Sequence, residues 1–120
     1  MTSLHNDDPL TFYLREVSKV RPLTKDEEAD LLRQFRTQRE PEAEFAAKLL
    51  IEANLPLVVS IAERHAAPGV DMVNLIERGN ESLLFALKTF GESSSDSLST
   101  HAATCIERAV AKAIAESAKN

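Results

Sequence analysis

The chain has 120 residues, of which 43% are hydrophobic and 28% charged, and its formal net charge is −5. This length suits one domain, and the acidic balance argues against non-specific nucleic-acid binding through net charge. A single cysteine excludes an intrachain disulfide and suits a reducing cytoplasm, and we find neither an apolar run of about 18 residues nor a basic leader. Few glycines and many Ala, Leu and Glu residues predict an all-α protein. From the single cysteine and the missing apolar run we expect it to be cytoplasmic and without a membrane span.

The first predicted helix follows a polar stretch, residues 1–7, that we expect to be flexible. Asp8 is a typical N-cap, and Pro9 suits the first helical position because it has no N–H to leave unpaired. Arg21 and Pro22 end this helix, since a residue before proline disfavours the α region. Its apolar positions at helical spacing are Leu10, Tyr13, Leu14 and Val17.

The second predicted helix begins with a capping box, in which Thr24 and Glu27 satisfy each other's backbone amides. It continues to about Gln38 and carries an apolar stripe of Leu31, Leu32 and Phe35. We group residues 8–38 as the leading helices of a single domain that covers residues 8–120.

A third helix is predicted from Pro41, with Phe45, Leu49, Leu50 and Ala53 facing inward. Pro56 cannot lie inside it, because proline lacks an N–H and its ring clashes with the preceding turn. We therefore expect a break at Asn54, which caps a fourth helix from Leu55 to about His65. The inward positions of that fourth helix are Leu57, Val58 and Ile61.

A fifth helix is predicted from its cap at Asp71 to about Phe90. Gly79 costs about 1 kcal/mol there relative to alanine, so it marks either a break or a close helix crossing. We favour one continuous helix. Its apolar positions are Val73, Leu75, Ile76, Leu83, Leu84, Leu87 and Phe90.

A flexible serine-rich connector at residues 93–97 precedes the last helix, which Ser99 or Thr100 caps. Its inward positions are Ile106, Ala109, Val110, Ala113 and Ile114. The predicted fold is a compact all-α bundle of five or six helices, with residues 41–120 as its central part.

Enzyme signatures are missing from the sequence. His5, His65 and His101 are too far apart for a metal-binding motif, and no glycine-rich phosphate loop is present. Cys105 follows His101 by four residues, so the two side chains could face each other, but a nucleophile pair also needs an orienting group and an oxyanion site. We interpret Cys105 as a small packed thiol and expect no catalytic residue, no metal and no cofactor.

Two stretches carry a more specific pattern. The first is DPLTFYLREV at residues 8–17, followed by PLTKDEE at residues 22–28. The second is LIEANLPLVVSIA at residues 50–62, followed by NLIERGN at residues 74–80. Together they closely resemble bacterial RNA polymerase sigma factors of the sigma-70 family. The resemblance runs from about residue 8 to residue 114 and covers the segment before the central domain and the central helical domain.

This resemblance implies a fold like the sigma factor central domain. It also implies that the helix at residues 74–90 docks on the clamp coiled coil of the polymerase largest subunit. A complete family member continues into helix-turn-helix domains, so we expect recognition of the promoter −35 element to be absent from this chain.

The docking helix matches the family at Leu75, Ile76, Gly79 and Asn80. Asn74, Glu77 and Arg78 stand where the family usually has Asp, Gln and Glu. A reversed charge at a polar interface costs several kcal/mol when the partner group is basic, so the resemblance implies an altered docking surface. The alternative is that Leu75, Ile76 and Gly79 only pack in the core.

The promoter-melting helix departs most from the family. The family pattern is aromatic-Ser-Thr-Tyr-Ala-Thr-Trp-Trp-Ile-Arg-Gln-Ala, whereas residues 98–109 are LSTHAATCIERA. His101, Thr104 and Cys105 replace the aromatic residues, which hold unstacked bases at roughly 1–3 kcal/mol per base. Glu107 replaces an arginine and puts a negative charge where a phosphate would approach.

We therefore predict a sigma-70-like transcription protein, truncated and without the DNA-melting aromatics, that acts in initiation or its regulation. Its expected partner is core RNA polymerase, through the clamp of the largest subunit, or a sigma-regulating protein. Phe85 is the strongest single candidate for an apolar contact with the partner, because it follows two leucines that can face inward and would itself be exposed. The predicted partner-binding residues are Asn74, Leu75, Glu77, Arg78, Asn80, Leu84 and Phe85.

The alternative is a divergent sigma factor that still binds promoter DNA with core polymerase. Its contact residues would be Tyr13, Arg15, Thr100, His101, Arg108 and Lys112. Tyr13 could stack on a base and Arg15 could pair with a phosphate. In the competing interpretation, Tyr13 packs on the bundle and Arg15 is solvated.

Overall fold

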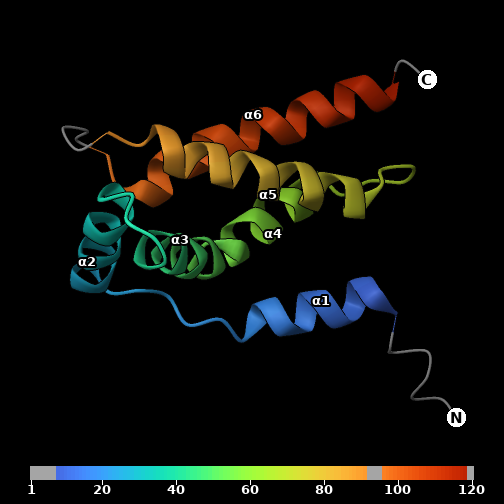
Figure 1. Ribbon diagram of the computed structural model, residues 1–120. Coiled ribbons are helices and arrows are strands. Elements are labelled where there is room, and N and C mark those ends of the chain that lie inside the picture. Colours follow the sequence, from blue (N-terminus) through green and yellow to red (C-terminus); the bar gives the residue numbers. More distant parts are fainter. Residues whose placement is uncertain (1–7, 92–95, 119–120) are drawn as a thin grey trace, which may run out of the picture.

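A computed structural model describes residues 8–91 and 96–118 of the chain, and the flexible N-terminus predicted for residues 1–7 lies outside them. So do residues 93–95 of the predicted connector. The described residues form six α-helices and no strand, which confirms the predicted all-α fold (Figure 1). The helices are α1 (Pro9–Ser18), α2 (Lys25–Arg36), α3 (Glu42–Ala53), α4 (Leu55–Arg64), α5 (Met72–Thr89) and α6 (Leu98–Ala118).

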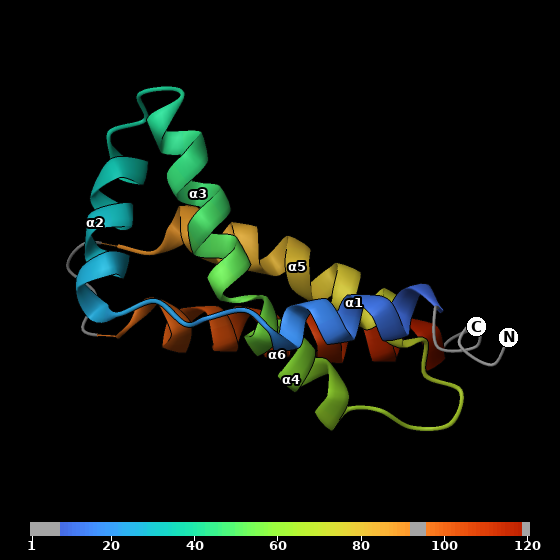
Figure 2. The same cartoon turned by 90° about the horizontal axis from the view of Figure 1, so that it is seen from below.

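The antiparallel pair α5 and α6 forms one layer, and α4 packs against both (Figure 1). α1 lies on the outer side of α4, while α2 and α3 form a hairpin that reaches away from the layer (Figure 2). The main core joins α4, α5 and α6, and its buried side chains include Val58, Ile61, Leu75, Ile76, Leu83, Ile106 and Val110. A smaller cluster of Leu32, Leu50, Leu87 and Leu98 attaches the hairpin to the layer.

The predicted starts of three helices are confirmed. The Asp8 carboxylate accepts a hydrogen bond from the Thr11 amide at 3.1 Å, and bonds from the Thr11 hydroxyl and amide hold the pKa of Asp8 below its usual value. Both bonds of the Thr24–Glu27 capping box are present. Asp71 accepts from two amides in the first turn of α5. These caps satisfy amides that the helix itself cannot pair.

Two helices end at least two residues earlier than predicted. α1 ends at Ser18, before Arg21, because its last turn closes with short-range bonds such as that from Lys19 N to Glu16 O. α2 ends at Arg36 rather than at Gln38, whose φ of 58° is left-handed.

The last helix begins at Leu98, two or three residues earlier than the predicted caps imply. The Ser97 hydroxyl accepts a hydrogen bond from the Thr100 amide at 3.2 Å. Ser97 therefore caps α6, and the prediction that Ser99 or Thr100 does so is wrong. Two of its predicted inward residues, Ala109 and Ile114, are only partly buried.

The inward side of α3 differs in part from the prediction, because Leu50 is buried as predicted but Phe45 is not. Phe45 is 59% exposed, whereas Ala43, Ala46 and Leu50 are buried at helical spacing. The two alanines let α3 pack closely on its neighbours, and this places Phe45 on the solvent side. The prediction that Phe45 faces the core is wrong.

The predicted break between α3 and α4 is present, but Asn54 has a different role. Its side-chain Nδ2 donates to the Leu50 carbonyl at 2.8 Å, and its side chain makes no cap bond to α4. Asn54 therefore satisfies a carbonyl at the end of α3, while Pro56 lies in the first turn of α4 as expected.

The segment Glu42–Arg64 is long and apolar enough to cross a membrane by composition, with a mean hydropathy of 1.6 in its most apolar window. This differs from the expectation that no such run exists. The segment is broken at Asn54, and 39% of the window is buried inside the fold. Core helices meet the same criteria, so the composition by itself does not indicate a membrane span.

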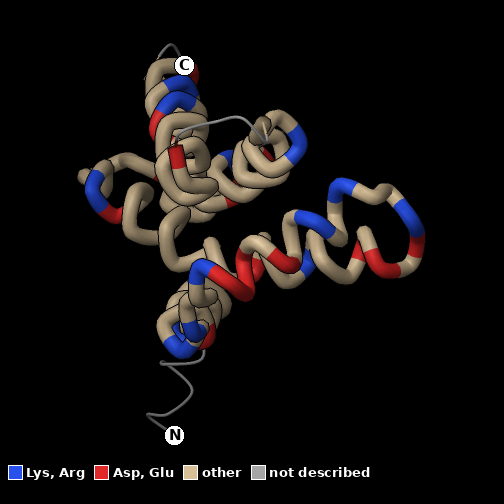
Figure 3. Tube along the Cα trace, turned by 90° about the vertical axis from the view of Figure 1, so that its left-hand side faces the viewer, with Lys and Arg blue, Asp and Glu red and all other residues tan. Residues whose placement is uncertain are grey.

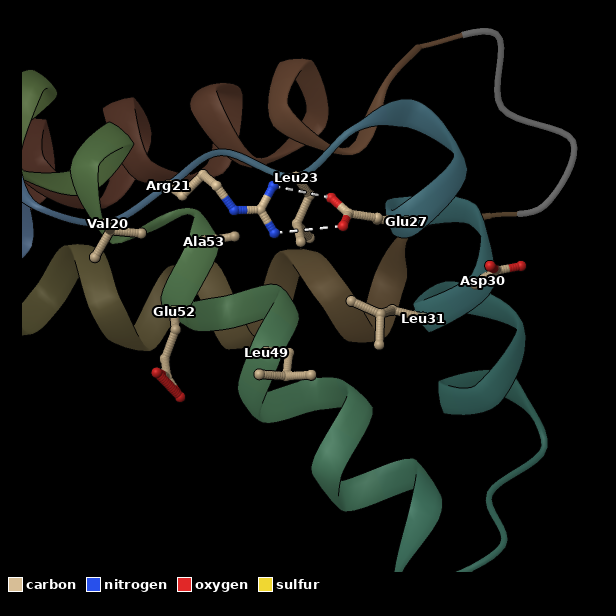
Figure 4. Close-up of a pocket in the computed structure, with 9 residues that line it drawn as sticks. All are labelled: Val20, Arg21, Leu23, Glu27, Asp30, Leu31, Leu49, Glu52 and Ala53. Carbon is tan, nitrogen blue, oxygen red and sulfur yellow. Dashed lines mark hydrogen bonds and ion pairs between the residues drawn. The ribbon is translucent and has the colours of Figure 1, made fainter.

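The linker between α1 and α2 is fixed to α2 by an ion pair. Arg21 donates from Nη1 and Nη2 to the two Glu27 carboxylate oxygens, each at 3.3 Å, at the rim of a hollow of about 470 Å³ beside α3 (Figure 4). Hydrogen bonds from the Thr24 backbone and from Arg21 lower the pKa of Glu27. Glu27 therefore combines the helix cap with the linker contact.

Glu27→Gln should lower stability at neutral pH by an amount that shrinks on acidification. A lowered pKa means that the carboxylate stabilises the fold above its usual pKa of about 4.5, and that this contribution is lost as the pH falls through the folded value. Urea unfolding of both proteins at pH 7 and pH 3, followed by circular dichroism, measures the difference. A difference that grows at pH 3 would contradict the assignment.

The close crossing proposed for Gly79 is present, and α5 is continuous through it. A Cβ atom at Gly79 would lie 2.7 Å from Val58 Cγ1 and 3.5 Å from Ile106 Cγ2. Val58 and Ile106 are fully buried, so neither side chain has space to move away. Gly79 is therefore needed for the contact between α5 and α4.

Gly79→Ala should destabilise the fold by about 1–3 kcal/mol through overpacking, although the same change in an exposed helix is stabilising. Urea unfolding measures the loss. The matched control is the change in a Val58→Ala background, where the clashing methyl is gone and the penalty should fall. A gain in stability from Gly79→Ala alone would refute the crossing.

Candidate protein-interaction site

α5 carries an apolar inner side and a mixed outer side. The inner residues are Leu75, Ile76, Gly79, Leu83, Ala86 and Leu87, all buried. On the outer side Phe85 is 60% exposed, which confirms its predicted exposure. Leu84 is 38% exposed, so the expectation that both leucines before Phe85 face inward is wrong for Leu84. Leu83 and Leu87 fill the core, and Leu84 lies one residue further round the helix.

Leu75 lies in the core and is 2% exposed. It therefore cannot offer its side chain to a partner in this arrangement, which favours the packing alternative for Leu75, Ile76 and Gly79. Asn74 is half-buried beside the end of α6, where it lines a hollow of about 210 Å³. Contacts from the outer side of α5 must come from its exposed residues, among them Glu77 and Arg78.

A groove of about 350 Å³ runs between α5 and α6. Its lining residues are Arg78, Glu81, Ser82 and Phe85 of α5, and Cys105, Arg108, Ala109, Lys112 and Ala113 of α6. The groove exists because three small residues, at positions 105, 109 and 113, follow one another along α6 at helical spacing. That spacing is the sequence signal through which it could have been found.

The groove carries more positive than negative charge. Arg108 and Lys112 are exposed and share one side of α6, and neither makes an ion pair with any residue that the structure describes. Arg78 lies opposite them and pairs with Glu116, its Nη2 being 3.6 Å from the carboxylate. Glu81 is the acidic residue among those that line the groove.

Two other predicted residues meet on a different side of α5. Asn80 Nδ2 donates to the Tyr13 hydroxyl at 3.3 Å, and both residues line a hollow of about 220 Å³ with Glu77. Among the described residues, Asn80 Oδ1 is buried without a hydrogen-bond partner. Tyr13 packs against the core, so it joins α1 to α5 rather than extending the α5–α6 groove.

Comparison with known families shows to which family the chain belongs. The family model for sigma-70 region 2 matches residues 50–119, more than half of the chain, and the model for sigma-70 factor region 1.2 matches residues 8–40. The chain belongs to the sigma-70 family. Region 2 of this sigma-70 chain includes α4, α5 and α6, and hence the α5–α6 groove.

Two curated relatives show how far the similarity extends. RNA polymerase sigma factor SigA of Lactococcus lactis subsp. cremoris is 38% identical over 119 residues, which is 99% of this chain and 32% of the relative. The protein of the same name from Clostridium acetobutylicum is 39% identical over 113 residues, 94% of this chain and 29% of the relative. The chain thus spans about a third of the length of these relatives.

Glu107 of the sigma-70 chain is turned toward α4. Its carboxylate lies 3.3 Å from His65 Nε2 and 3.5 Å from Arg64 Nη2. The carboxylate therefore joins α6 to α4 and is not among the groups that line the α5–α6 groove. Glu107 thus does not neutralise Arg108 or Lys112 in the groove.

His101 occupies the junction between α5 and α6. Its Nε2 lies 3.0 Å from Thr89 Oγ1 and 4.0 Å from Cys105 Sγ, and its ring is 5.8 Å from the Phe90 ring. These contacts assign His101 a packing role between two helix ends. No group of three potential metal ligands occurs in the described part of the sigma-70 chain.

The six residues predicted for nucleic-acid binding do not share one surface. Arg108 and Lys112 line the groove, whereas Tyr13 lies against Asn80 beyond another side of α5. His101 packs between helix ends, with Thr100 exposed beside it, and Arg15 is exposed on α1. The groove instead joins two residues from each predicted set: Arg78 and Phe85, and Arg108 and Lys112.

Proposed function

We propose that this chain is a sigma-70-like transcription protein that acts in initiation or its regulation by binding another protein through the outer side of α5. The partner is core RNA polymerase, at the clamp of its largest subunit, or a sigma-regulating protein. The observation that carries the proposal is the match to two sigma-70 regions together with the exposure of Glu77, Arg78 and Phe85 on one helix. The same proposal treats residues 8–120 as one domain.

Phe85 supplies the apolar part of this surface. Burying a phenylalanine side chain contributes about 1.5–3 kcal/mol, and aromatic and arginine residues dominate protein interfaces. Arg78 lines the same groove about two helical turns away and stands where the family pattern has glutamate, so a basic group on the partner would be repelled. The charge therefore selects among partners, and the aromatic ring adds affinity.

Protein contact is favoured over DNA melting. The residues at the tyrosine and tryptophan positions of the family pattern are His101, Thr104 and Cys105. Two of them present no aromatic face, and the His101 ring is packed against Phe90. A sigma-like role needs no catalytic residue, metal or cofactor, and a polymerase partner would place the protein in the cytoplasm.

Phe85→Ala should weaken binding to purified core RNA polymerase, or to a captured sigma regulator, by about tenfold, since truncation of an interface aromatic costs 1 kcal/mol or more. Arg78→Glu should weaken binding as well. Biolayer interferometry with the immobilised chain measures both, and affinity capture from the native cell with mass spectrometry identifies a regulator.

Phe45→Ala is the matched control, because Phe45 is 59% exposed on α3 and Phe85 is 60% exposed on α5. It should leave the affinity unchanged. Recovery of neither polymerase nor any transcription regulator at low salt would refute the proposed function.

The second candidate function is promoter binding with core polymerase, and the observation that favours it is the shared exposure of Arg108 and Lys112. It predicts salt-dependent binding of single-stranded −10 DNA in the presence of core polymerase. Fluorescence anisotropy that shows no binding at low salt eliminates this candidate.

A further inference from the structure

We infer that the α5–α6 groove binds a helical segment of a partner protein that carries acidic side chains around an apolar anchor. This inference rests on the proposed function and names the chemistry of its partner. The groove lies between two antiparallel helices, an arrangement that receives a third, amphipathic helix.

The charge of the groove selects an acidic partner. Arg78 lies on one wall, and Arg108 and Lys112 lie four residues apart on the other. The chain as a whole has a net charge of −5, so this groove is a local exception to its surface. A helix with carboxylates at matching spacing would meet cations on both walls.

The apolar part of the groove provides a place for the anchor. Phe85 stands at one wall, and Cys105, Ala109 and Ala113 form the small-residue side opposite. Cys105 occupies a position where the family pattern has tryptophan, a side chain large enough to fill much of this space. A partner's leucine or phenylalanine can instead enter between Phe85 and Cys105 and lose its contact with water.

A protein fits this surface better than a nucleic acid. A phosphate backbone presents a negative charge at every nucleotide and requires a continuous basic track. Here Glu81 lines the groove and Glu116 pairs with Arg78, so acidic groups interrupt the basic ones. Figure 3 shows Asp and Glu close to Lys and Arg at several places along the chain. The mixture suits a partner that carries separated charges and an apolar centre.

The test uses the full chain, labelled with ¹⁵N, and two synthetic helical peptides of about 18 residues. One peptide has glutamates flanking a leucine-phenylalanine stripe, and the other has the same glutamates with the stripe replaced by alanine. The first should bind with shifts at the amides of residues 78–85 and 105–113, and bind at least about tenfold more tightly than the second.

The double variant Arg108→Glu with Lys112→Glu should bind the first peptide at least about tenfold more weakly, mainly at low salt. Lys25→Glu with Lys48→Glu is the matched control, because it changes the net charge equally at exposed positions outside the groove. Cys105→Trp should block the peptide by filling the groove, and circular dichroism verifies that each variant is folded.

Equal binding of both peptides, or equal weakening by the control variant, would overturn the inference, because it would leave only non-specific charge attraction. So would a single-stranded DNA of about 20 nucleotides that binds the groove more tightly than the first peptide. If the first peptide does not bind but polymerase or a regulator does, only the inference about the groove is refuted. If the first peptide binds but neither polymerase nor a regulator does, only the proposed function is refuted.

Discussion

The approach of α5 to α4 at Gly79 determines where every exposed group on α5 lies. Even a methyl group at Gly79 would overlap Val58, so the α5 backbone lies directly against α4, with Ile106 of α6 beside it. Protein interiors are packed too densely for helices held in this way to rotate. Once the inner side of α5 is fixed, Phe85 and Arg78 have no other direction in which to point than away from the core. The interaction surface therefore depends on a buried contact.

The groove shows how such a fold separates stability from recognition. Its cations are exposed, and exposed charges contribute about 0–1 kcal/mol to folding even when they are paired, so they can change sign at little cost. The same charges alter association rates and the choice of partner strongly. Ile106 and Val110 on the inner side of α6 have no such freedom, because they are fully buried. A sigma-like core can thus carry a surface whose charge differs from the family pattern.

The sequence predicted best those features that depend on neighbouring residues. Asp8, Thr24 and Asp71 cap helices as expected, because a cap needs only the amides of its own first turn. Phe45 was predicted on the wrong side of α3, since the rotation of a helix is decided by what packs against it. Asn54 is predicted to cap α4 but bonds to α3, because its Nδ2 donor lies within reach of the Leu50 carbonyl at the end of α3.

The candidate site could be predicted only in parts. Arg78 and Phe85 belong to one stretch of the family pattern, Arg108 and Lys112 to another, so sequence comparison assigned them to two different partners. Only the antiparallel pairing of α5 and α6 reveals that all four line one groove. Considered one at a time, these two departures from the family pattern remove contacts that the pattern implies. They are Arg78, at a glutamate position, and Cys105, at a tryptophan position. Taken together in the groove, the small thiol leaves a space and Arg78 adds a cation opposite Arg108 and Lys112, which are the two requirements for receiving an acidic helix.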